Sequence, residues 1–348
     1  MTAIILDAHL ASALSAVRSL GKRGVRVVCG GERKTAMSFY SKYCRQSFVY
    51  PNPLKDPAGF VEKIKTVSDQ LLTPVIYSFS DNTFLPWQRS GGQSENIEIA
   101  FDKKRTLALA ESLAIPVPKT LNDQENLNFP VAIKPRHNCS WLKVPATFET
   151  TVFAYSLSEL KKKKEAIFQR TGEEPIIQEY VEGEERGLFF LFDQGQPLTV
   201  FAHRRLRSIN PAGGASSLRE SITVPEKLLA YSLKLMASLK WQGPAMLEFK
   251  GDKLMEINGR FWGSLPLAIF SGVDFPWLYY QLATGQRPDS PQSYKIGIKS
   301  RNLLADFRNF WRWPFGRDLY YDVFSGDDPQ PFFREFIDVL SRKIFMVS

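Results

Sequence analysis

The most informative segment of the chain reads Leu254-Met255-Glu256-Ile257-Asn258-Gly259-Arg260-Phe261-Trp262-Gly263-Ser264. An apolar segment at residues 245–250, which contains Glu248, precedes it, and the Gly251-Asp252 pair between the two is typical of a tight turn. We therefore expect a β-hairpin. If the hairpin is centred on Asp252, Glu248 lies opposite Glu256, and Asn258 and Arg260 follow at alternate positions on the same face.

The two facing glutamates, Glu248 and Glu256, repel each other, because like charges directly across a sheet are destabilising. A divalent cation removes this repulsion, and Mg²⁺ takes carboxylate and amide oxygens and completes its shell with water and substrate phosphates. Two alternatives stay open. A register shift of one residue would place the glutamates on opposite faces of a solvated strand, and Glu256 could instead form a structural ion pair with Arg260.

The first part of the chain has the pattern of a parallel α/β unit. Apolar runs at residues 3–6 and 24–28 flank residues 12–20, which carry apolar side chains at helical spacing, so a β-α-β opening is expected. Another buried strand is expected at residues 74–79, and Asp81 follows its carboxyl end, where open parallel sheets bind ligands. Asp81 is therefore a candidate substrate contact, with the alternative that it caps the next helix.

From Asp102 the pattern changes to that of an α+β unit. A helix is expected from Asp102 to Leu113, and it ends before Pro116 and Pro118, because proline cannot continue a helix. The other expected elements are strands at residues 130–134, 146–154, 175–181, 187–192, 198–202, 245–250 and 253–258, and helices at residues 158–169 and 228–239. Beyond residue 285 the sequence is rich in proline and aromatic residues, and we treat it as an appended tail.

The composition limits the class of protein. The 348 residues, 44% of them hydrophobic, are enough for several folded domains. The 3 cysteines lack CxxC spacing, which argues against a disulfide framework or a structural zinc site and fits a reducing cytoplasm. Without a basic leader or an apolar run of membrane-spanning length, a cytoplasmic protein with no transmembrane segment is expected. The net charge is +9, but the basic residues are not arranged in a stripe with aromatic residues between them, as in surfaces that stack bases. No nucleic-acid partner is therefore expected.

Residues 254–264 resemble the metal-binding signature of the ATP-grasp superfamily. The resemblance implies that Glu248, Glu256 and Asn258 hold Mg²⁺, with Mn²⁺ as an alternative. It also implies that Arg260 contacts the transferring phosphate or acyl phosphate. Lys134, at the end of an apolar strand, matches the first phosphate-contacting lysine of the family, although a lysine that reaches from a strand edge to solvent has the same local pattern.

A second segment, Gln178-Glu179-Tyr180-Val181-Glu182-Gly183-Glu184-Glu185, resembles the hinge of the same family. In that hinge, backbone groups contact adenine, which implies this role for Gln178, Glu179 and Val181. A following glutamate binds the ribose hydroxyls. Glu185 is the expected one, and Glu184 is the alternative.

The resemblance also implies a division of the chain into three parts. Residues 1–98 would form a pre-ATP-grasp α/β domain, and residues 99–285 an ATP-grasp domain with a small lid subdomain at about 125–182. Residues 286–348 would be a C-terminal extension. Within the second part, residues 102–118 resemble the helix and Pro-x-Pro exit of carbamoyl-phosphate-synthase-like and carboxylase-like members. The expected fold class is α/β and α+β.

The loop after Lys134 departs from the family pattern. Family members usually have glycines there, whose amides cradle the terminal phosphates. Here the loop reads Pro135-Arg136-His137-Asn138-Cys139-Ser140-Trp141-Leu142-Lys143 and contains no glycine. Arg136, His137 or Lys143 could supply charge instead.

A second candidate anion loop consists of Arg204, Arg205 and Arg207, followed by the glycine- and serine-containing residues 210–217. Arg204 is the expected substrate contact within it. A flexible lid with basic flanks is an equal alternative.

The function that the resemblance implies is that of a ligase. ATP and Mg²⁺ would convert a small-molecule carboxylate into an acyl phosphate, and an amine or similar nucleophile would then capture it with formation of a C–N bond. One alternative is an ATP-binding regulatory or scaffold protein without turnover, because the loop after Lys134 lacks glycine. Another is a protein that binds nucleic acid or anionic lipid through residues 299–317, with Trp311 and Trp313. The sequence pattern identifies neither the two substrates nor the oligomeric state.

Overall fold

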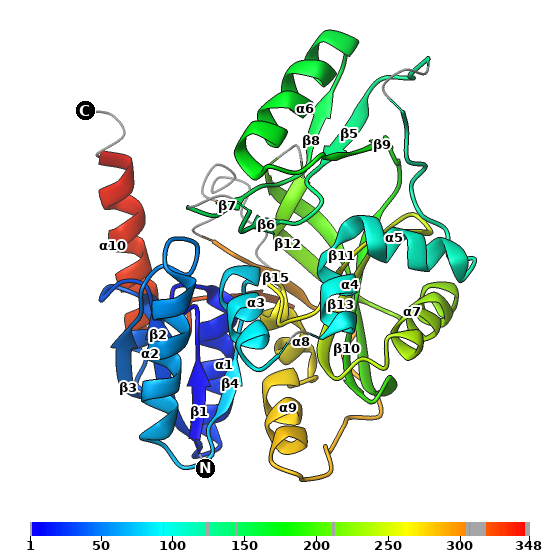
Figure 1. Ribbon diagram of the computed structural model, residues 1–348. Helices are drawn as coiled ribbons and strands as arrows, with labels where there is room; N and C mark the ends of the chain where they lie inside the picture. The colour runs from blue at the N-terminus through cyan, green and yellow to red at the C-terminus, as the bar shows by residue number, and fades with distance from the viewer. Residues whose placement is uncertain are drawn as a thin grey trace.

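The computed structural model describes residues 2–92, 94–122, 126–142, 145–210, 213–303, 306 and 318–344. Figure 1 shows three parts, which we call the first domain, the lid and the large sheet. The expected α/β unit followed by an α+β unit is confirmed.

The first domain is built on a parallel sheet with the strand order β3-β2-β1-β4. Its elements are β1 (Thr2–Ile5), α1 (Ala11–Lys22), β2 (Arg26–Gly31), η1 (Met37–Tyr40), β3 (Cys44–Val49), α2 (Pro57–Asp69), β4 (Val75–Tyr77) and α3 (Asp81–Ser90). Alternate residues of β1 face opposite ways, so that Ala3 and Ile5 pack with α1 while Ile4 packs with α2. This burial on both faces is the pattern of a parallel sheet covered by helices, and it confirms the predicted β-α-β opening.

Two helices, α4 (Glu95–Phe101) and α5 (Lys103–Ser112), lead from the first domain into the lid. Asp102 lies between them and caps α5, since its carboxylate accepts hydrogen bonds from the backbone N–H groups of Lys104 and Arg105. The helix predicted after Asp102 is therefore confirmed.

The lid is a three-stranded antiparallel sheet with the order β8-β5-β9. Its strands are β5 (Val131–Lys134), β8 (Val152–Ala154) and β9 (Ile176–Glu179), and α6 (Leu157–Thr171) packs on them through Leu160 and Ile167. The single strand predicted at residues 146–154 is wrong. The chain forms β7 (Thr147–Phe148), which pairs with β6 (Cys139–Ser140), and then turns before β8 pairs with β5.

The large sheet has the strand order β14-β13-β10-β11-β12-β15-β16. Its strands are β10 (Glu185–Asp193), β11 (Gln196–Asn210), β12 (Gly213–Ile222), β13 (Gly243–Lys250), β14 (Lys253–Asn258), β15 (Lys299–Arg301) and β16 (Leu319–Tyr321). Helix α7 (Glu226–Ser238) covers one face, and α8 (Leu265–Ser271) and α9 (Phe275–Ala283) cover the other. The predicted strands at 187–192 and 198–202 are present but longer, because β10 and β11 pair over most of their length.

The segment beyond residue 285 is joined to the rest of the molecule. β15 pairs with β12, and β16 pairs with β15, so both strands extend the large sheet. Asp328, just before α10 (Gln330–Ile344), accepts a 2.9 Å hydrogen bond from Arg18 Nε of the first domain. The prediction of an appended tail is therefore wrong for these residues, while Trp311 and Trp313 lie outside the described residues.

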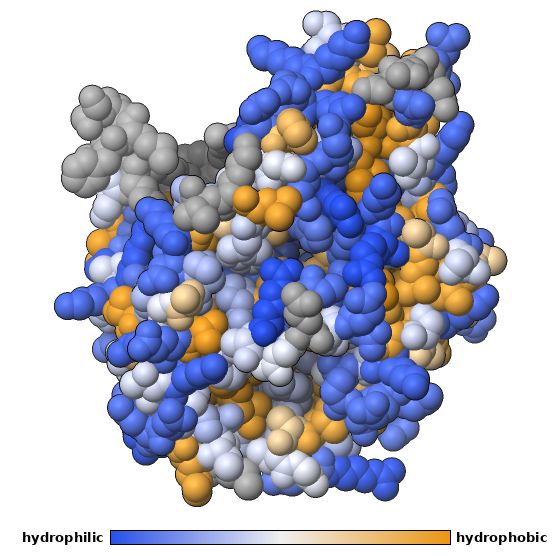
Figure 2. All heavy atoms as spheres, viewed as in Figure 1, coloured by the Kyte–Doolittle hydropathy of each residue, from blue (hydrophilic) through white to orange (hydrophobic). Residues whose placement is uncertain are grey.

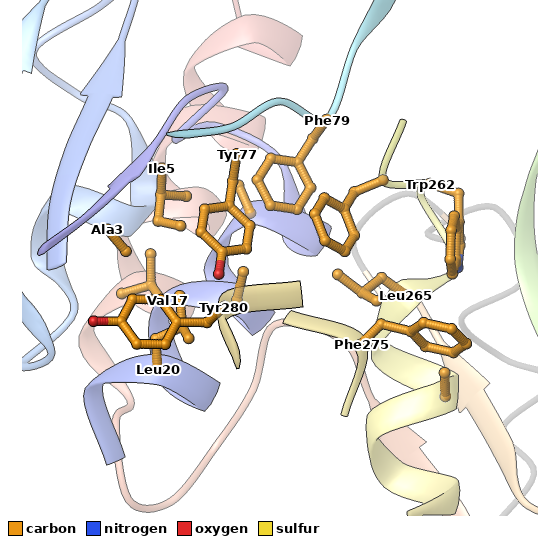
Figure 3. Close-up of a cluster of buried hydrophobic side chains, with 14 of the residues drawn as sticks. Ala3, Ile5, Val17, Leu20, Tyr77, Phe79, Trp262, Leu265, Phe275 and Tyr280 are labelled. Atoms are coloured by element: carbon orange, nitrogen blue, oxygen red, sulfur yellow. The ribbon is translucent and has the colours of Figure 1, made fainter. Parts of the chain in front are cut away.

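One apolar core joins the first domain to the large sheet. Tyr77 and Phe79 of the first domain stack on Phe261, which follows β14, with ring centroids 5.5 and 5.4 Å apart. Figure 3 shows that Trp262, Leu265 and other side chains of this segment lie in the same cluster as those of β1 and α1. Because these side chains are buried together, the residues next to them at the end of β4 and of β14 are held close.

Candidate active site

The β13–β14 hairpin has the predicted register at its acidic residues. Lys250 pairs with Lys253 across the Gly251-Asp252 turn. A continuous ladder from this turn would bring Glu248 opposite Met255, but the register shifts at this point and Glu248 pairs with Glu256. The bulge therefore restores the facing carboxylates that the sequence analysis expected.

Glu248, Glu256 and Asn258 form one polar cluster. The Asn258 side-chain nitrogen donates to Glu248 Oε1 at 3.2 Å and to Glu256 Oε1 at 3.4 Å. Burial raises the pKa of Glu248 to about 7, and the negative charge of Glu256 contributes in the same direction, while Arg205 opposes it. Burial and the neighbouring carboxylate therefore disfavour the charged form of Glu248, and a bound cation would favour it.

Two lysines approach this cluster from the lid side. Lys134, the last residue of β5, is only 5% exposed, and burial lowers its pKa to about 8, against the raising influence of Glu256. Lys103, the first residue of α5, is 7% exposed, and its Nζ lies 3.6 Å from Glu256 Oε2. The structure therefore brings Lys134 to the place expected for it, next to a second lysine that the sequence analysis did not select.

Arg260 and Asp81 meet at the border of the first domain and the large sheet. Arg260 Nε donates to Asp81 Oδ1 at 2.8 Å, and both side chains are largely buried. Asp81 is the first residue of α3, and Ser80 rather than Asp81 caps that helix. Asp81 Oδ2 also accepts a 3.2 Å hydrogen bond from Asn138, in the loop after Lys134.

The predicted hinge follows β9. Gln178 is fully buried, and its Oε1 has no hydrogen-bond partner among the described residues, which leaves one acceptor available for a donor group. The Glu179 carboxylate accepts a hydrogen bond from Lys119 N at 2.8 Å and forms an ion pair with Lys253 at the start of β14. Val181 is half-buried in the segment that leads to β10. The hinge is thereby tied to the hairpin that carries the acidic cluster.

Glu184 and Glu185 point in different directions. Glu185 forms an ion pair with Arg205 and lies 3.7 Å from Lys250 Nζ, and Arg205 in turn lies 3.6 Å from Glu248 Oε2. Glu184 instead binds Arg204, whose other partner is Glu220. Because neighbouring strand residues face opposite ways, Glu185 shares the face of Glu248, whereas Arg204 does not.

The placement of the arginines corrects one interpretation from the sequence. Arg204, Arg205 and Arg207 lie on β11, within the large sheet, and not in an anion-binding loop. Their charges are used by carboxylates of neighbouring strands or of the C-terminal segment: Arg207, for example, pairs with Asp306. Residues 211–212, at the turn of the expected loop, lie outside the described residues.

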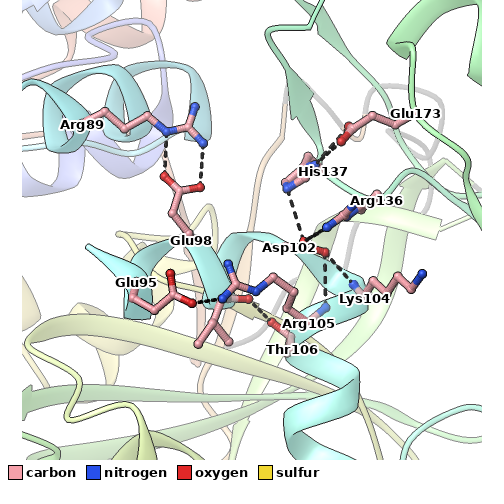
Figure 4. A network of polar contacts seen from close by, with 11 residues as sticks. Arg89, Glu95, Glu98, Asp102, Lys104, Arg105, Thr106, Arg136, His137 and Glu173 are labelled. Carbon is pink, nitrogen blue, oxygen red and sulfur yellow. Dashed lines mark hydrogen bonds and ion pairs between the residues drawn. The ribbon is translucent and has the colours of Figure 1, made fainter. Parts of the chain in front are cut away.

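The loop after Lys134 is docked by its charged side chains (Figure 4). Arg136 donates to Asp102 Oδ2 at 2.9 and 2.6 Å, and His137 Nδ1 lies 2.9 Å from a Glu173 oxygen. Arg136 and His137, which could have supplied charge to phosphate in place of glycine amides, are both paired with carboxylates of the protein. Lys143 lies outside the described residues.

A pocket lies where these parts converge. Its lining consists of Asp81, Ala100, Phe101, Lys103, Thr106, Asn138, Glu256 and Ile257. In the view of Figure 2, hydrophilic side chains surround the hollow between the first domain and the lid. The lining therefore joins a first-domain aspartate, a lid-side lysine and a glutamate of the β13–β14 hairpin in one polar space.

A family model described as "ATP-grasp in the biosynthetic pathway with Ter operon" matches residues 171–303, which include Glu185, Glu248, Glu256 and Arg260. No curated protein sequence matches the chain.

Several solved structures resemble this one over most of its length. The biotin carboxylase domain of 2-oxoglutarate carboxylase from Hydrogenobacter thermophilus, a complex with MgADP, ADP and bicarbonate, superposes with a TM-score of 0.63 at 15% identity, covering 86% of this chain and 73% of that one. N5-carboxyaminoimidazole synthetase from Staphylococcus aureus, a complex with ADP, gives 0.62 at 13% identity, covering 86% and 80%. L-amino acid ligase from Bacillus licheniformis gives 0.57 at 16% identity, covering 81% and 74%.

Residues 171–303 match an ATP-grasp family model, and the chain shares the fold of these solved structures. The family match and the shared fold agree with the resemblance of residues 254–264 to the ATP-grasp metal signature. Lys134 and Asp81 precede the matched residues, so their place in the candidate site rests on the geometry described above.

Sequence analysis missed two residues of this candidate site, Lys103 and Asn138. Lys103 carried a usable signal, because a cation in the first turn of a helix is disfavoured by the helix dipole and so calls for an anionic partner. Asn138 carried none. Its contacts with Asp81 and Lys103 depend on the fold, since 57 and 35 residues of chain separate these partners.

Proposed function

We propose that this protein is an ATP- and Mg²⁺-dependent ligase that activates a carboxylate as an acyl phosphate and joins it to an amine. The observation that carries the proposal is the pairing of Glu248 with Glu256 across the hairpin, with Lys103, Lys134 and Arg260 nearby. Phosphoryl transfer needs positioning and charge neutralisation more than a protein nucleophile. A site with two carboxylates for a metal and three cations for phosphate oxygens meets that need.

The donor set fits Mg²⁺. The described residues contain no cluster of three or more His, Cys, Asp or Glu side chains, so a complete protein cage of acidic ligands is not formed there. Mg²⁺ typically takes one or two carboxylates and completes its shell with water and phosphates, which matches Glu248, Glu256 and the Asn258 amide oxygen. When bound, Mg²⁺ would be held by Glu248, Glu256 and Asn258 and would neutralise negative charge on the nucleotide phosphates.

The hinge fits an adenine nucleotide. Gln178 Oε1, a buried acceptor without a partner among the described residues, can accept a hydrogen bond from the exocyclic amine of adenine. Glu185 lies on the same face as Glu248 and would accept hydrogen bonds from the ribose hydroxyls. The nucleotide would then run from the hinge to the acidic cluster, with Lys134 on its phosphates.

The proposed reaction has two steps. A carboxylate oxygen of the substrate attacks the γ-phosphorus, the bond to the bridging oxygen breaks, and ADP leaves. An amine nitrogen then attacks the acyl carbon, loses a proton, and displaces phosphate with one oxygen from the original carboxylate. Arg260 and Lys134 would stabilise the negative charge on the transferred group, because preorganised donors act strongly in a buried site.

Small-molecule carboxylates and amines are the proposed substrates. Biotin carboxylase, N5-carboxyaminoimidazole synthetase and L-amino acid ligase share the fold, and the last is named for the ligation of L-amino acids. Of the described helices, none is both long enough and apolar enough to pass through a bilayer.

Oxygen labelling tests the proposal directly. The protein is incubated with Mg·ATP, a panel of carboxylic acids and amino acids labelled with ¹⁸O in the carboxyl group, and amine acceptors. The expected result is phosphate that carries one ¹⁸O atom, with none formed by Glu256→Gln. Unlabelled phosphate would refute the acyl phosphate, and nucleotide binding without any phosphate release would favour a regulatory protein.

A further inference from the structure

The guanidinium group of Arg260 is fixed on two sides. Its Nε donates to Asp81 Oδ1 at 2.8 Å, and its Nη1 donates to the Phe261 carbonyl at 3.0 Å. Within the described residues, no acceptor binds the third nitrogen, Nη2. The protein therefore holds the orientation of the group and leaves donors on one edge for another molecule.

Asp81 reaches Arg260 from a different domain. It is 4% exposed at the start of α3, where the helix N-terminus favours a negative charge. Both of its oxygens have protein partners, Arg260 on one and Asn138 on the other. The sequence analysis expected Asp81 to contact substrate, whereas its partners within the protein are Arg260 and Asn138.

The same contacts continue around the pocket. Asn138 Oδ1 accepts a 2.5 Å hydrogen bond from Lys103 Nζ, which lies 3.6 Å from Glu256 Oε2. Arg260, Asp81, Asn138, Lys103 and Glu256 thus form a chain of polar contacts, and four of them line the pocket. The donors of Arg260 and the metal-binding carboxylates are set relative to each other through Asp81.

We propose that Asp81 is a positioning residue that holds the Arg260 guanidinium against the phosphoryl group in transfer. The proposal rests on the proposed function, in which Arg260 binds that group. It gives the first domain a part in the chemistry. The sequence does not reveal this part, because Asp81 and Arg260 are 179 residues apart along the chain.

The sign of the effect distinguishes positioning from a simple charge effect. Removal of the negative charge of Asp81 makes the surroundings of Arg260 more positive, so electrostatics alone predicts tighter binding of an anion. Loss of the hydrogen bond that orients Arg260 predicts weaker binding, because misplaced donors lose much of their effect.

The test is a double-mutant cycle with the full-length protein. Affinity for Mg·ADP is measured by calorimetry with and without aluminium fluoride, which mimics the transferring phosphoryl group. The variants are Asp81→Ala, Arg260→Met and the double variant, with Asp69→Ala, an exposed aspartate of α2, as the matched control. If Asp81→Ala does not fold, Asp81→Asn, which keeps the shape of the side chain, replaces it in the same cycle.

Aluminium fluoride increases the affinity for Mg·ADP by some factor, and we expect Asp81→Ala to reduce this factor about tenfold. The affinity of the variant for Mg·ADP alone should stay within about threefold of the wild-type value. In the Arg260→Met background the same change has no further effect. Unchanged or tighter fluoride-dependent binding, or a full additional loss in that background, would overturn the proposal. The assay needs no turnover, so a failed ligase reaction and a failed positioning role give different results.

Discussion

The β13–β14 hairpin and the loop after Lys134 treat their charged side chains in opposite ways. In the hairpin, Glu248 and Glu256 face each other, burial raises the pKa of Glu248, and the nearest cations, Lys103 and Arg205, lie 3.6 Å from their oxygens. In the loop, Arg136 and His137 are bound by Asp102 and Glu173. In this protein, facing carboxylates without close cationic partners mark the candidate ligand site, whereas side chains with close partners hold the loop in shape.

Changing Glu256 to Gln is expected to have the largest effect. The change removes one facing carboxylate, so turnover is expected to fall by about a hundredfold to a thousandfold, with a matching loss of Mg²⁺ affinity. Phosphate release measured against Mg²⁺ concentration checks this. Glu111→Gln, an exposed glutamate on α5, is the control, and turnover of Glu256→Gln within a few-fold of the wild type would break the comparison.

Lys134→Met is expected to stabilise the empty protein while it weakens nucleotide binding. Burial lowers the pKa of Lys134 from 10.5 to about 8, so its charge at pH 7 is held at a cost of up to about 3 kcal/mol. Between pH 8 and 10.5 the unfolded chain holds a proton that the folded chain does not, so wild-type stability rises with pH in that range.

The stabilisation by Lys134→Met should therefore be greatest near pH 7 and fade toward pH 10.5. Urea unfolding of both proteins across this range measures it. Lys161→Met, at an exposed position of α6, should show no such trend. A variant that is less stable than the wild type at pH 7 would show that other groups of the protein offset the cost of burying the Lys134 charge.

Asp102→Ala should affect the scaffold more than the ligand. Asp102 caps α5 and binds Arg136, so its loss is expected to lower the free energy of unfolding by about 2 kcal/mol. Affinity for Mg·ADP should change far less than in Glu256→Gln. Calorimetric titration beside urea unfolding separates the two, and a loss of nucleotide affinity as large as that of Glu256→Gln would mean that the loop belongs to the ligand site.

Glu149→Gln should have the smallest effect. The Glu149 carboxylate pairs with Arg170, whose side chain is 51% exposed, and exposed ion pairs contribute less than about 1 kcal/mol. Thermal unfolding at low and high salt should give nearly the same midpoint for both proteins. A large, salt-independent loss would show that this end of the lid is held by more than an exposed pair.

The sequence predicted the hairpin well because its signals are local. Alternating side chains and the Gly251-Asp252 turn set the faces of Glu248, Glu256 and Asn258. The bulge that completes the register depends on the neighbouring strand geometry and has no sequence signal of its own. The expected pairing of Glu248 with Glu256 is therefore present only because the bulge shifts the register.

The loop could not be predicted in the same way, because its partners are distant. His137 binds Glu173, 36 residues further along the chain, and Arg136 binds Asp102, 34 residues earlier. Propensity and periodicity do not report such pairs, so the same residues looked available for phosphate. The joining of β15 to β12 was hidden for the same reason.

A crystal structure with Mn²⁺ and ADP tests the central claim most directly, since anomalous scattering locates the metal without assumptions about its ligands. The account predicts one metal peak within coordination distance, about 2.2 Å, of oxygens from both Glu248 and Glu256, with the adenine at residues 178–181. A nucleotide bound at the hinge with the metal away from both carboxylates would contradict it.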